Sequence, residues 1–354
     1  MSFLLSSELF RHLQEGTVIP AHPLALKETK DLDETYQKLL TNYYIEAGAG
    51  GIAVGVHTTQ FEIRDPEYHL YEKVLSLAAE TISEADIKRP FLKIAGICGE
   101  TAQAMEEAAL ARDLGYHLGL VSLGGLNHYS EKQLVHHLQE IATVIPIFGF
   151  YLQPAVGGRS LSFQFWREAA EIESLYAIKI APFNRYQTLD VVRAVCESRR
   201  RNEIALYTGN DDHLLMDLLS TYRFKVNDDI VEKRIVGGLL GHWAFWTSKA
   251  VEIFEEIKKV RMNDCVPVQY FKLANEITDA NAAIFDAKNN FSGCISGIHE
   301  VLKRQGLLKY NICLNENETL SEGQLEEIDR IYQAYPHLND DDFVQQFLQK
   351  DQIK

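Results

Sequence analysis

Short apolar runs alternate with longer amphipathic segments along most of the chain. The apolar runs predict eight strands, at 16–24, 50–56, 91–97, 117–123, 145–152, 175–180, 203–209 and 233–239. Several of these runs are apolar on both faces, which is typical of a parallel sheet covered by helices. Segments such as 33–48 and 101–116 carry their apolar positions at helical spacing instead. The pattern therefore predicts an α/β protein.

Eight strand–helix units between residues 16 and 258 favour a (β/α)8 TIM barrel. The main alternative is a doubly wound open sheet, because periodicity alone does not show that a sheet closes. The stretch IPAHPLALKETKDLD (19–33), after the first strand, lacks the glycine spacing that holds a dinucleotide, which weakens that alternative. We expect a catalytic barrel over residues 1–260 and a helical extension packed on it over 261–354, with a polar loop at 307–320.

Composition and charge narrow the class of protein. The 354 residues are 46% hydrophobic and 24% charged, which is ordinary for a globular protein. A net charge of −15 argues against nucleic acid or an anionic membrane as a partner. The first ten residues lack the basic start of a signal peptide and predict a short amphipathic helix. We expect a soluble cytoplasmic protein with no membrane-spanning segment.

The cysteines and histidines show no metal-binding spacing. Five cysteines without a CxxC pair indicate free thiols in a reducing compartment: Cys98, Cys196, Cys265, Cys294 and Cys313. We therefore expect no metal, and the chemistry considered next requires no cofactor.

Candidate chemistry lies at the carboxyl ends of the predicted strands, which line the mouth of a barrel. Lys179, in YAIKIAPF (176–183), is the charged residue of an apolar run. Desolvation lowers the pKa of such an amine, and the neutral amine can attack a carbonyl. Tyr151, on the preceding strand, is expected to point inward and to move protons during imine formation. Thr58 and Thr59 offer hydroxyl and N–H donors for a carboxylate, so the set predicts a Schiff base with an α-keto acid.

These residues resemble those of the dihydrodipicolinate synthase/N-acetylneuraminate lyase family of Schiff-base aldolases, over roughly residues 10–260. The resemblance implies that Lys179, in AIKIAP, forms the imine. It also implies that Tyr151, in YLQP, is the family's strand-5 tyrosine. The stretch HTTQF (57–61) matches the family's Gly-Thr-Thr-Gly-Glu turn, which binds the pyruvate carboxylate. Thr58 and Thr59 carry over from that turn.

Further substrate-binding residues follow from the same resemblance. Gly209 and Asp211, in TGNDD, match a Gly-x-Asp turn, and Val236 is expected near the imine pocket through its backbone. His57 stands at a glycine position of the carboxylate turn and is a candidate specificity residue or base. A packed core histidine is the alternative for His57, and a helix cap is the alternative for Asp211.

Several positions depart from the pattern of the synthases. Val156 stands where they have an arginine for the second substrate, with Arg159 three residues further on. Gly124–Leu126 occupy the place of a proton-relay tyrosine, and Tyr129 comes a few residues late. Residues 180–182, after the lysine, lack the usual hydroxyls. These losses indicate a divergent member that is not a true dihydrodipicolinate synthase.

The leading hypothesis is a class I lyase or aldolase that acts on an α-keto acid such as pyruvate through an imine on Lys179. One alternative is a hydratase or dehydratase that uses the same imine. Another is a barrel that has lost catalysis and serves as a binding protein. The resemblance also implies a homodimer or homotetramer.

Overall fold

The structure, a computed structural model, describes residues 5–351. Its contacts divide the chain into two compact units. Unit 1 holds the described residues up to Thr17 together with Leu92–Leu239, and unit 2 holds Val18–Phe91 together with the described residues from Leu240 onward.

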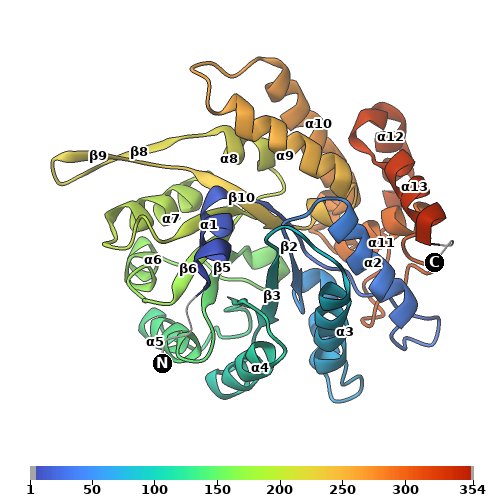
Figure 1. Cartoon of the computed structure of the whole chain (residues 1–354), viewed down its shortest axis with the longest axis horizontal. Coiled ribbons are helices and arrows are strands. Elements are labelled where there is room, and N and C mark those ends of the chain that lie inside the picture. Colours follow the sequence, from blue (N-terminus) through green and yellow to red (C-terminus); the bar gives the residue numbers. More distant parts are fainter. Residues whose placement is uncertain (1–4, 352–354) are drawn as a thin grey trace. The chain divides into compact units, whose positions relative to one another are not determined.

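Eight strands belong to one sheet, and helices separate them along the chain (Figure 1). These strands are β1 Val18–Pro20, β2 Gly51–Val54, β3 Leu92–Ile97, β4 Leu118–Val121, β5 Ile147–Leu152, β6 Leu175–Ala181, β7 Ala205–Thr208 and β10 Ile235–Leu240. The architecture is a (β/α)8 TIM barrel with C-terminal helices, so the predicted fold class is confirmed.

Unit 1 contains six neighbouring strands in the order β3-β4-β5-β6-β7-β10, and every neighbouring pair is parallel. The helices of this unit are α1 Ser7–Glu15, α4 Thr101–Asp113, α5 Glu131–Ala142, α6 Phe163–Ala169, α7 Arg185–Glu197 and α8 Leu214–Leu219. Local sequence determines where they begin. At α5, for example, the Ser130 and Gln133 side chains bond each other's backbone N–H groups in a capping box.

The inner face of these strands is lined by large side chains. Phe148 on β5 and Tyr207 on β7 meet edge to face, with ring centroids 5.3 Å apart. The Tyr207 hydroxyl donates to the Leu13 carbonyl at 2.9 Å, which ties α1 to the interior. Gly16 ends α1 with φ +82°, and a Cβ there would lie 2.0 Å from the Val236 carbonyl oxygen. Only glycine fits this close approach.

An antiparallel hairpin interrupts the strand–helix alternation of unit 1. Its strands, β8 Tyr222–Val226 and β9 Asp229–Lys233, extend beyond α7 (Figure 1). The sequence prediction missed this hairpin, although YRFKVNDDIVEK alternates apolar and polar residues around an Asn-Asp turn.

Unit 2 contains the parallel pair β1 and β2, bridged at Ala21 and Ala53, and all the C-terminal helices. Its helices are α2 Glu34–Glu46, α3 Tyr71–Glu84, α9 Thr247–Val260, α10 Gln269–Ile284, α11 Cys294–Arg304, α12 Gln324–Ala334 and α13 Asp341–Asp351. The Arg330 guanidinium holds the Asp279 carboxylate with two bonds, 2.7 and 3.0 Å long, and so ties α12 to α10. The predicted boundary at 260/261 falls where α9 ends and stays a prediction.

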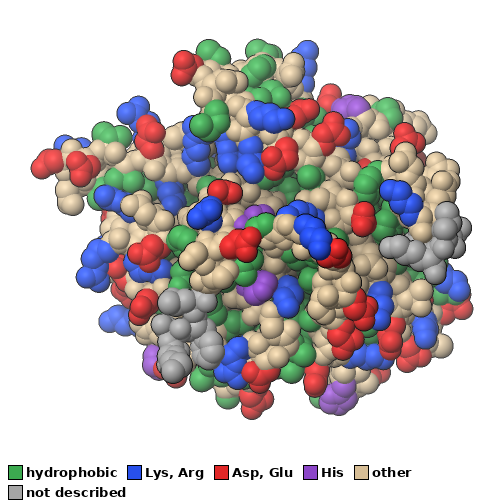
Figure 2. Space-filling model, in the orientation of Figure 1, with side chains coloured by type: hydrophobic (Ala, Val, Ile, Leu, Met, Phe, Trp, Pro, Cys, Tyr) green, Lys and Arg blue, Asp and Glu red, His purple; other side chains and the backbone are tan. Residues whose placement is uncertain are grey.

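Acidic and basic side chains are interspersed over the face that Figure 2 shows. The negative net charge is therefore not gathered into one patch on that face. Of the helices described, none is long and apolar enough to cross a membrane.

Candidate functional site

Lys179 lies on the inner face of β6, two residues before the strand ends. Its side chain is 8% exposed, and burial lowers the pKa of the amine to about 8. The Asp211 carboxylate opposes this effect by attracting the charged form. The lowered pKa leaves a larger share of this amine neutral near pH 7.5 than of an ordinary lysine, which is neutral in about one molecule in a thousand.

Phe150, and not Tyr151, lies opposite Lys179. Ile147 on β5 pairs with Leu175 on β6, and if this offset continued it would bring Tyr151 opposite Lys179. The register slips by one residue directly after Ile147, so Phe150 becomes the partner instead. The Lys179 Nζ atom lies 4.4 Å from the centroid of the Phe150 ring. The amine therefore contacts an aromatic face that cannot transfer protons.

The predicted inward orientation of Tyr151 is wrong for this reason. Tyr151 faces the helices, where its ring packs on Trp166 of α6 with centroids 5.3 Å apart. Its hydroxyl accepts from the Leu161 N–H at 3.1 Å and donates to the Leu161 carbonyl at 3.3 Å. Both hydrogen-bonding roles of the phenol are thus used by the backbone that leads into α6.

Gly209 lies directly against Lys179, and its role in substrate binding stays a prediction. A Cβ added at Gly209 would lie 2.7 Å from the Lys179 Cε atom and 2.8 Å from the Ala181 Cβ atom. The Gly209 N–H also donates to the Ile180 carbonyl at 2.8 Å. The position therefore excludes every side chain, and Asp211 follows two residues later at the carboxyl end of β7.

Asn210 and Asp217 support this end of unit 1, and the sequence prediction named neither residue. Asn210 is fully buried, accepts from the Phe183 N–H at 3.0 Å and donates to Asp217 at 2.9 Å. The Asp217 carboxylate also accepts from Thr208 at 2.7 Å and pairs with Arg185. Burial alone would raise the Asp217 pKa, but the His213 and Arg185 contacts lower it overall. The network joins the loop after Lys179 to the loop that carries Asp211.

Val236 lies at an irregular point of β10. The register of β10 is irregular between Ile235 and Gly237, and Gly237 is level with Tyr207, which pairs with Lys179. The Val236 carbonyl oxygen packs against Gly16. The expected backbone contact of Val236 with the imine pocket stays a prediction.

In unit 2, His57–Thr59 form a short 3-10 turn after β2. The Thr59 hydroxyl donates to the His22 carbonyl at 2.7 Å and accepts from the Gly55 and Val56 N–H groups at 3.0 and 3.2 Å. The Thr59 N–H donates to the Val56 carbonyl at 3.0 Å. Both donors of Thr59 are therefore used within the turn, contrary to the expectation that they are available for a carboxylate.

Thr58 is held less tightly. Its hydroxyl donates to the same His22 carbonyl over 3.3 Å, the longer of the two bonds. The His57 ring lies 6.1 Å from the ring of Phe61, centroid to centroid. The structure thus retains Thr58 and His57 as candidates, and it assigns Thr59 a structural role.

The Arg159 side chain forms hydrogen bonds with the backbone of the loop after β4. Its Nη1 atom donates to the Leu126 and Tyr129 carbonyls at 3.1 and 2.9 Å. The guanidinium therefore fixes the loop after β4, at the point where the synthases place their relay tyrosine.

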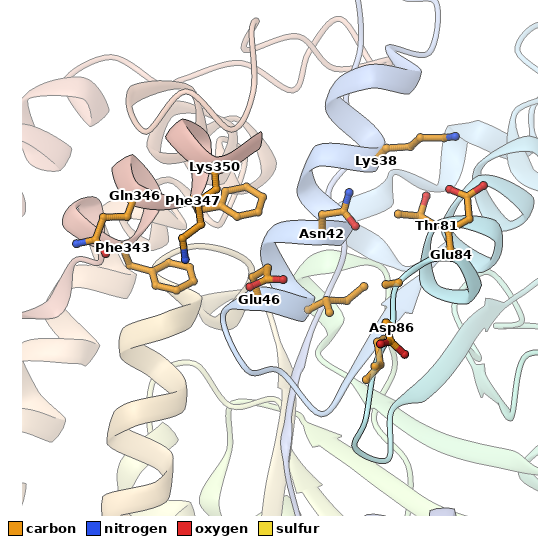
Figure 3. A pocket seen from close by; sticks show the side chains of 13 residues that line it. Lys38, Asn42, Glu46, Thr81, Glu84, Asp86, Phe343, Gln346, Phe347 and Lys350 are labelled. Carbon is orange, nitrogen blue, oxygen red and sulfur yellow. The ribbon is translucent and has the colours of Figure 1, made fainter. Parts of the chain in front are cut away.

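A cavity of about 600 Å³ opens in unit 2 among α2, the end of α3 and α13 (Figure 3). Glu46 and Asn42 on α2 and Phe347 on α13 line it. None of the predicted site residues is among its lining residues, so this cavity is separate from the candidate site. Over residues 5–351, no group of three or more His, Cys, Asp or Glu side chains is arranged to hold a metal ion.

A TIM barrel with a buried amine near the carboxyl end of its sixth strand fits the class of Schiff-base, aldolase-type lyases. The chain belongs to the dihydrodipicolinate synthetase family, whose model matches residues 15–221, more than half of the chain. No curated protein matches the sequence.

Solved structures of the same fold cover nearly the whole chain. The dihydrodipicolinate synthase of Oceanobacillus iheyensis is 15% identical, with a TM-score of 0.74 over 93% of this chain and 99% of that one. The N-acetylneuraminate lyase of Fusobacterium nucleatum is 17% identical, with a TM-score of 0.70 over 92% and 99%. The dihydrodipicolinate synthase of Acinetobacter baumannii, solved with pyruvate, is 20% identical, with a TM-score of 0.71 over 90% and 98%. At these identities the likeness concerns the fold.

Proposed function

We propose that the chain is a class I lyase or aldolase that forms an imine between Lys179 and an α-keto acid such as pyruvate. The observation that carries the proposal is the Lys179 amine, buried in the interior with a pKa lowered to about 8. Pyruvate is supported by the family and by the structure of the Acinetobacter relative that holds it. Sialic acids and other sugar-derived keto acids belong to the same proposal.

In the proposed mechanism the neutral Lys179 amine attacks the keto carbon, and the carbinolamine loses water to give the iminium. In cleavage the iminium accepts the electron pair of the C–C bond that breaks and becomes an enamine. In synthesis the iminium first loses an α-proton, and the resulting enamine supplies the electron pair of the new C–C bond. Imine formation needs proton transfers to and from the oxygen. We propose Asp211 as the group that carries out these proton transfers, because its charge acts on the Lys179 amine. Tyr151 is not proposed for this role, because it faces the helices. Within the turn after β2, Thr58 is the residue that we propose to bind the carboxylate of the keto acid.

We further propose that the substrate differs from that of a true dihydrodipicolinate synthase. Val156 replaces the arginine for the second substrate, and the Arg159 guanidinium bonds backbone carbonyls. A homodimer or homotetramer in the cytoplasm stays part of the proposal, with the family as its support.

One observation favours the second candidate, a barrel that binds keto acids without turning them over. Phe150 stands where a phenol would serve the amine. Turnover of a panel of aldol adducts by the native protein and by Lys179→Met separates the two. The lyase hypothesis predicts keto-acid release that the variant abolishes, and a binding protein shows no release with either. Release that is unchanged in Lys179→Met would overturn the proposed chemistry.

A further inference from the structure

The nitrogen of Lys179 lies against the face of one aromatic ring. Its Nζ atom is 4.4 Å from the centroid of the Phe150 ring, which stands on the neighbouring strand of unit 1. Within residues 5–351, this nitrogen forms no hydrogen bond and no ion pair. A positive charge on the nitrogen is therefore placed directly over the π electrons of Phe150.

The packing of unit 1 holds both partners of this contact in place. Gly209 on the β7 side meets the stem of Lys179, since a Cβ there would lie 2.7 Å from the Lys179 Cε atom and 3.2 Å from its Cγ atom. Phe150 lies on β5, which pairs with β4 on one side and with β6 on the other. The close approach of Gly209 and the strand pairing thus fix the nitrogen over the ring.

The surroundings of the contact make it effective. An aromatic face attracts a cation because its π electrons carry partial negative charge, and the attraction is strongest where both partners are desolvated. Phe150 is 4% exposed, and Lys179 is nearly as deeply buried. Burial also makes an uncompensated charge costly, so a cation at this place needs a stabilising neighbour.

The proposed reaction generates a positive charge on this same nitrogen. The neutral amine and the keto carbonyl take up one proton and release water, as the C–N bond forms and the C–O bond breaks. The nitrogen of the resulting iminium carries the charge that attracts the electron pair of the C–C bond. A neutral imine attracts this pair less strongly, so the reaction depends on keeping the nitrogen protonated.

The titratable groups of unit 1 that face the amine do not replace the ring. Asp211 attracts the charged form, but the pKa of Lys179 stays lowered because the effect of burial is larger. Tyr207 pairs with Lys179 across β7 and β6, and its hydroxyl donates to the Leu13 carbonyl at 2.9 Å. Burial raises the pKa of this phenol, so it stays uncharged.

We propose that Phe150 is a catalytic residue of this site, whose ring face stabilises the iminium on Lys179 through a cation–π interaction. The inference rests on the proposed function, and it assigns a role to the ring that stands where the sequence motif predicts a phenol. The ring favours every charged form of the nitrogen, which includes the ammonium of the free protein and the iminium of the adduct.

The test replaces Phe150 with mono-, di- and trifluorophenylalanine. Fluorine withdraws electrons from the ring face and weakens its attraction for a cation in steps, while the ring keeps nearly the same size and stays apolar. The charge on the free amine is measured as the pH at which imine formation, followed by reductive trapping of pyruvate, reaches half its maximal rate.

The charge on the adduct needs a second measurement. At saturating pyruvate, exchange of the pyruvate methyl hydrogens with deuterated water proceeds through the iminium, and it falls as the iminium loses its proton. The pH of this half-fall and the pH of half-maximal trapping should both decrease with each added fluorine. For the trifluorinated ring we expect each to be lower by about one pH unit.

Phe148 provides the matched control, because it lies two residues earlier on the same face of β5. Its ring meets the Tyr207 ring edge to face, with centroids 5.3 Å apart. The same fluorinated residues at Phe148 should leave both pH values unchanged. If the Phe150 proteins with fluorinated rings do not fold, Phe150→Leu removes the ring, keeps an apolar side chain and should lower both pH values in the same way.

The negative results have different meanings. If the native protein traps pyruvate and the folded Phe150 proteins keep both native pH values, the Phe150 inference is overturned and the proposed function stands. A shift in the trapping value alone, or an equal shift with fluorinated Phe148, also overturns the role in stabilising the iminium. If the native protein traps no keto acid at all, the proposed function fails, and this inference fails with it.

Discussion

Phe150 on β5 lies opposite Lys179 on β6, with the ammonium nitrogen 4.4 Å from the ring centroid. The one-residue slip after Ile147 produces this pairing and turns Tyr151 toward Trp166. The Lys179 amine therefore faces the Phe150 ring, whereas the sequence motif around Tyr151 predicts a phenol beside the amine.

Tyr151→Phe should leave imine formation within about threefold of the native rate, because the phenol does not reach the amine. The same variant should lower the free energy of unfolding by about 1–3 kcal/mol, since the Leu161 N–H and carbonyl lose their partner. Reductive trapping kinetics and urea unfolding measure the two effects. A hundredfold loss of trapping in a folded variant would show that the tyrosine serves the amine after all.

Gly209→Ala should slow imine formation at least about tenfold, because the new Cβ would lie 2.7 Å from the Lys179 Cε atom and displace the amine. Gly149→Ala on β5 is the control, since a Cβ there would meet Ile178 and Trp166 at an ordinary 3.5 Å. Trapping rates of both variants at saturating pyruvate give the comparison. Equal rates would mean that Gly209 does not constrain the lysine.

The rate of imine formation should rise with pH and level off above about pH 8, as the buried amine loses its proton. The folded state binds its proton less tightly than the unfolded chain, so stability rises with pH between about 8 and the ordinary lysine value near 10.4. Lys179→Met should therefore be more stable than the native protein at pH 7, and the difference should shrink by up to about 3 kcal/mol by pH 10. A constant difference across this range would contradict the lowered pKa.

Thr59→Val should destabilise the protein by about 2–4 kcal/mol, because the His22 carbonyl and the Gly55 and Val56 N–H groups all lose their partner. Thr59→Ser keeps the hydroxyl and should stay within about 1 kcal/mol of the native protein. Urea unfolding of both variants provides the measurement. If Thr59→Val were as stable as Thr59→Ser, the hydroxyl would not hold the turn.

The sequence predicted much of this architecture because apolar runs and amphipathic helices leave a strong periodic signal. The eight strands and the position of Lys179 follow from that signal. The orientation of Tyr151 did not follow, because the whole of β5 is buried and its alternation does not distinguish an inner from an outer face. A one-residue slip in such a strand leaves no trace in the sequence.

The turn after β2 contains contacts that could not be predicted from the sequence, for a different reason. The sequence indicates the hydroxyl groups of Thr58 and Thr59, but it does not indicate that Thr59 closes its own turn. Nor does it connect Gln60, which follows this turn, with Leu314, whose N–H donates to the Gln60 side chain, since 254 positions separate them. Contacts at this separation depend on the packing of the C-terminal helices, which local patterns do not encode.

Borohydride trapping of the native protein with pyruvate, followed by peptide mapping, tests the imine on Lys179 most directly. We predict one reduced pyruvyl adduct per chain, on Lys179, and no adduct on Lys179→Met. An adduct on another lysine, or none from a panel of α-keto acids, would contradict it.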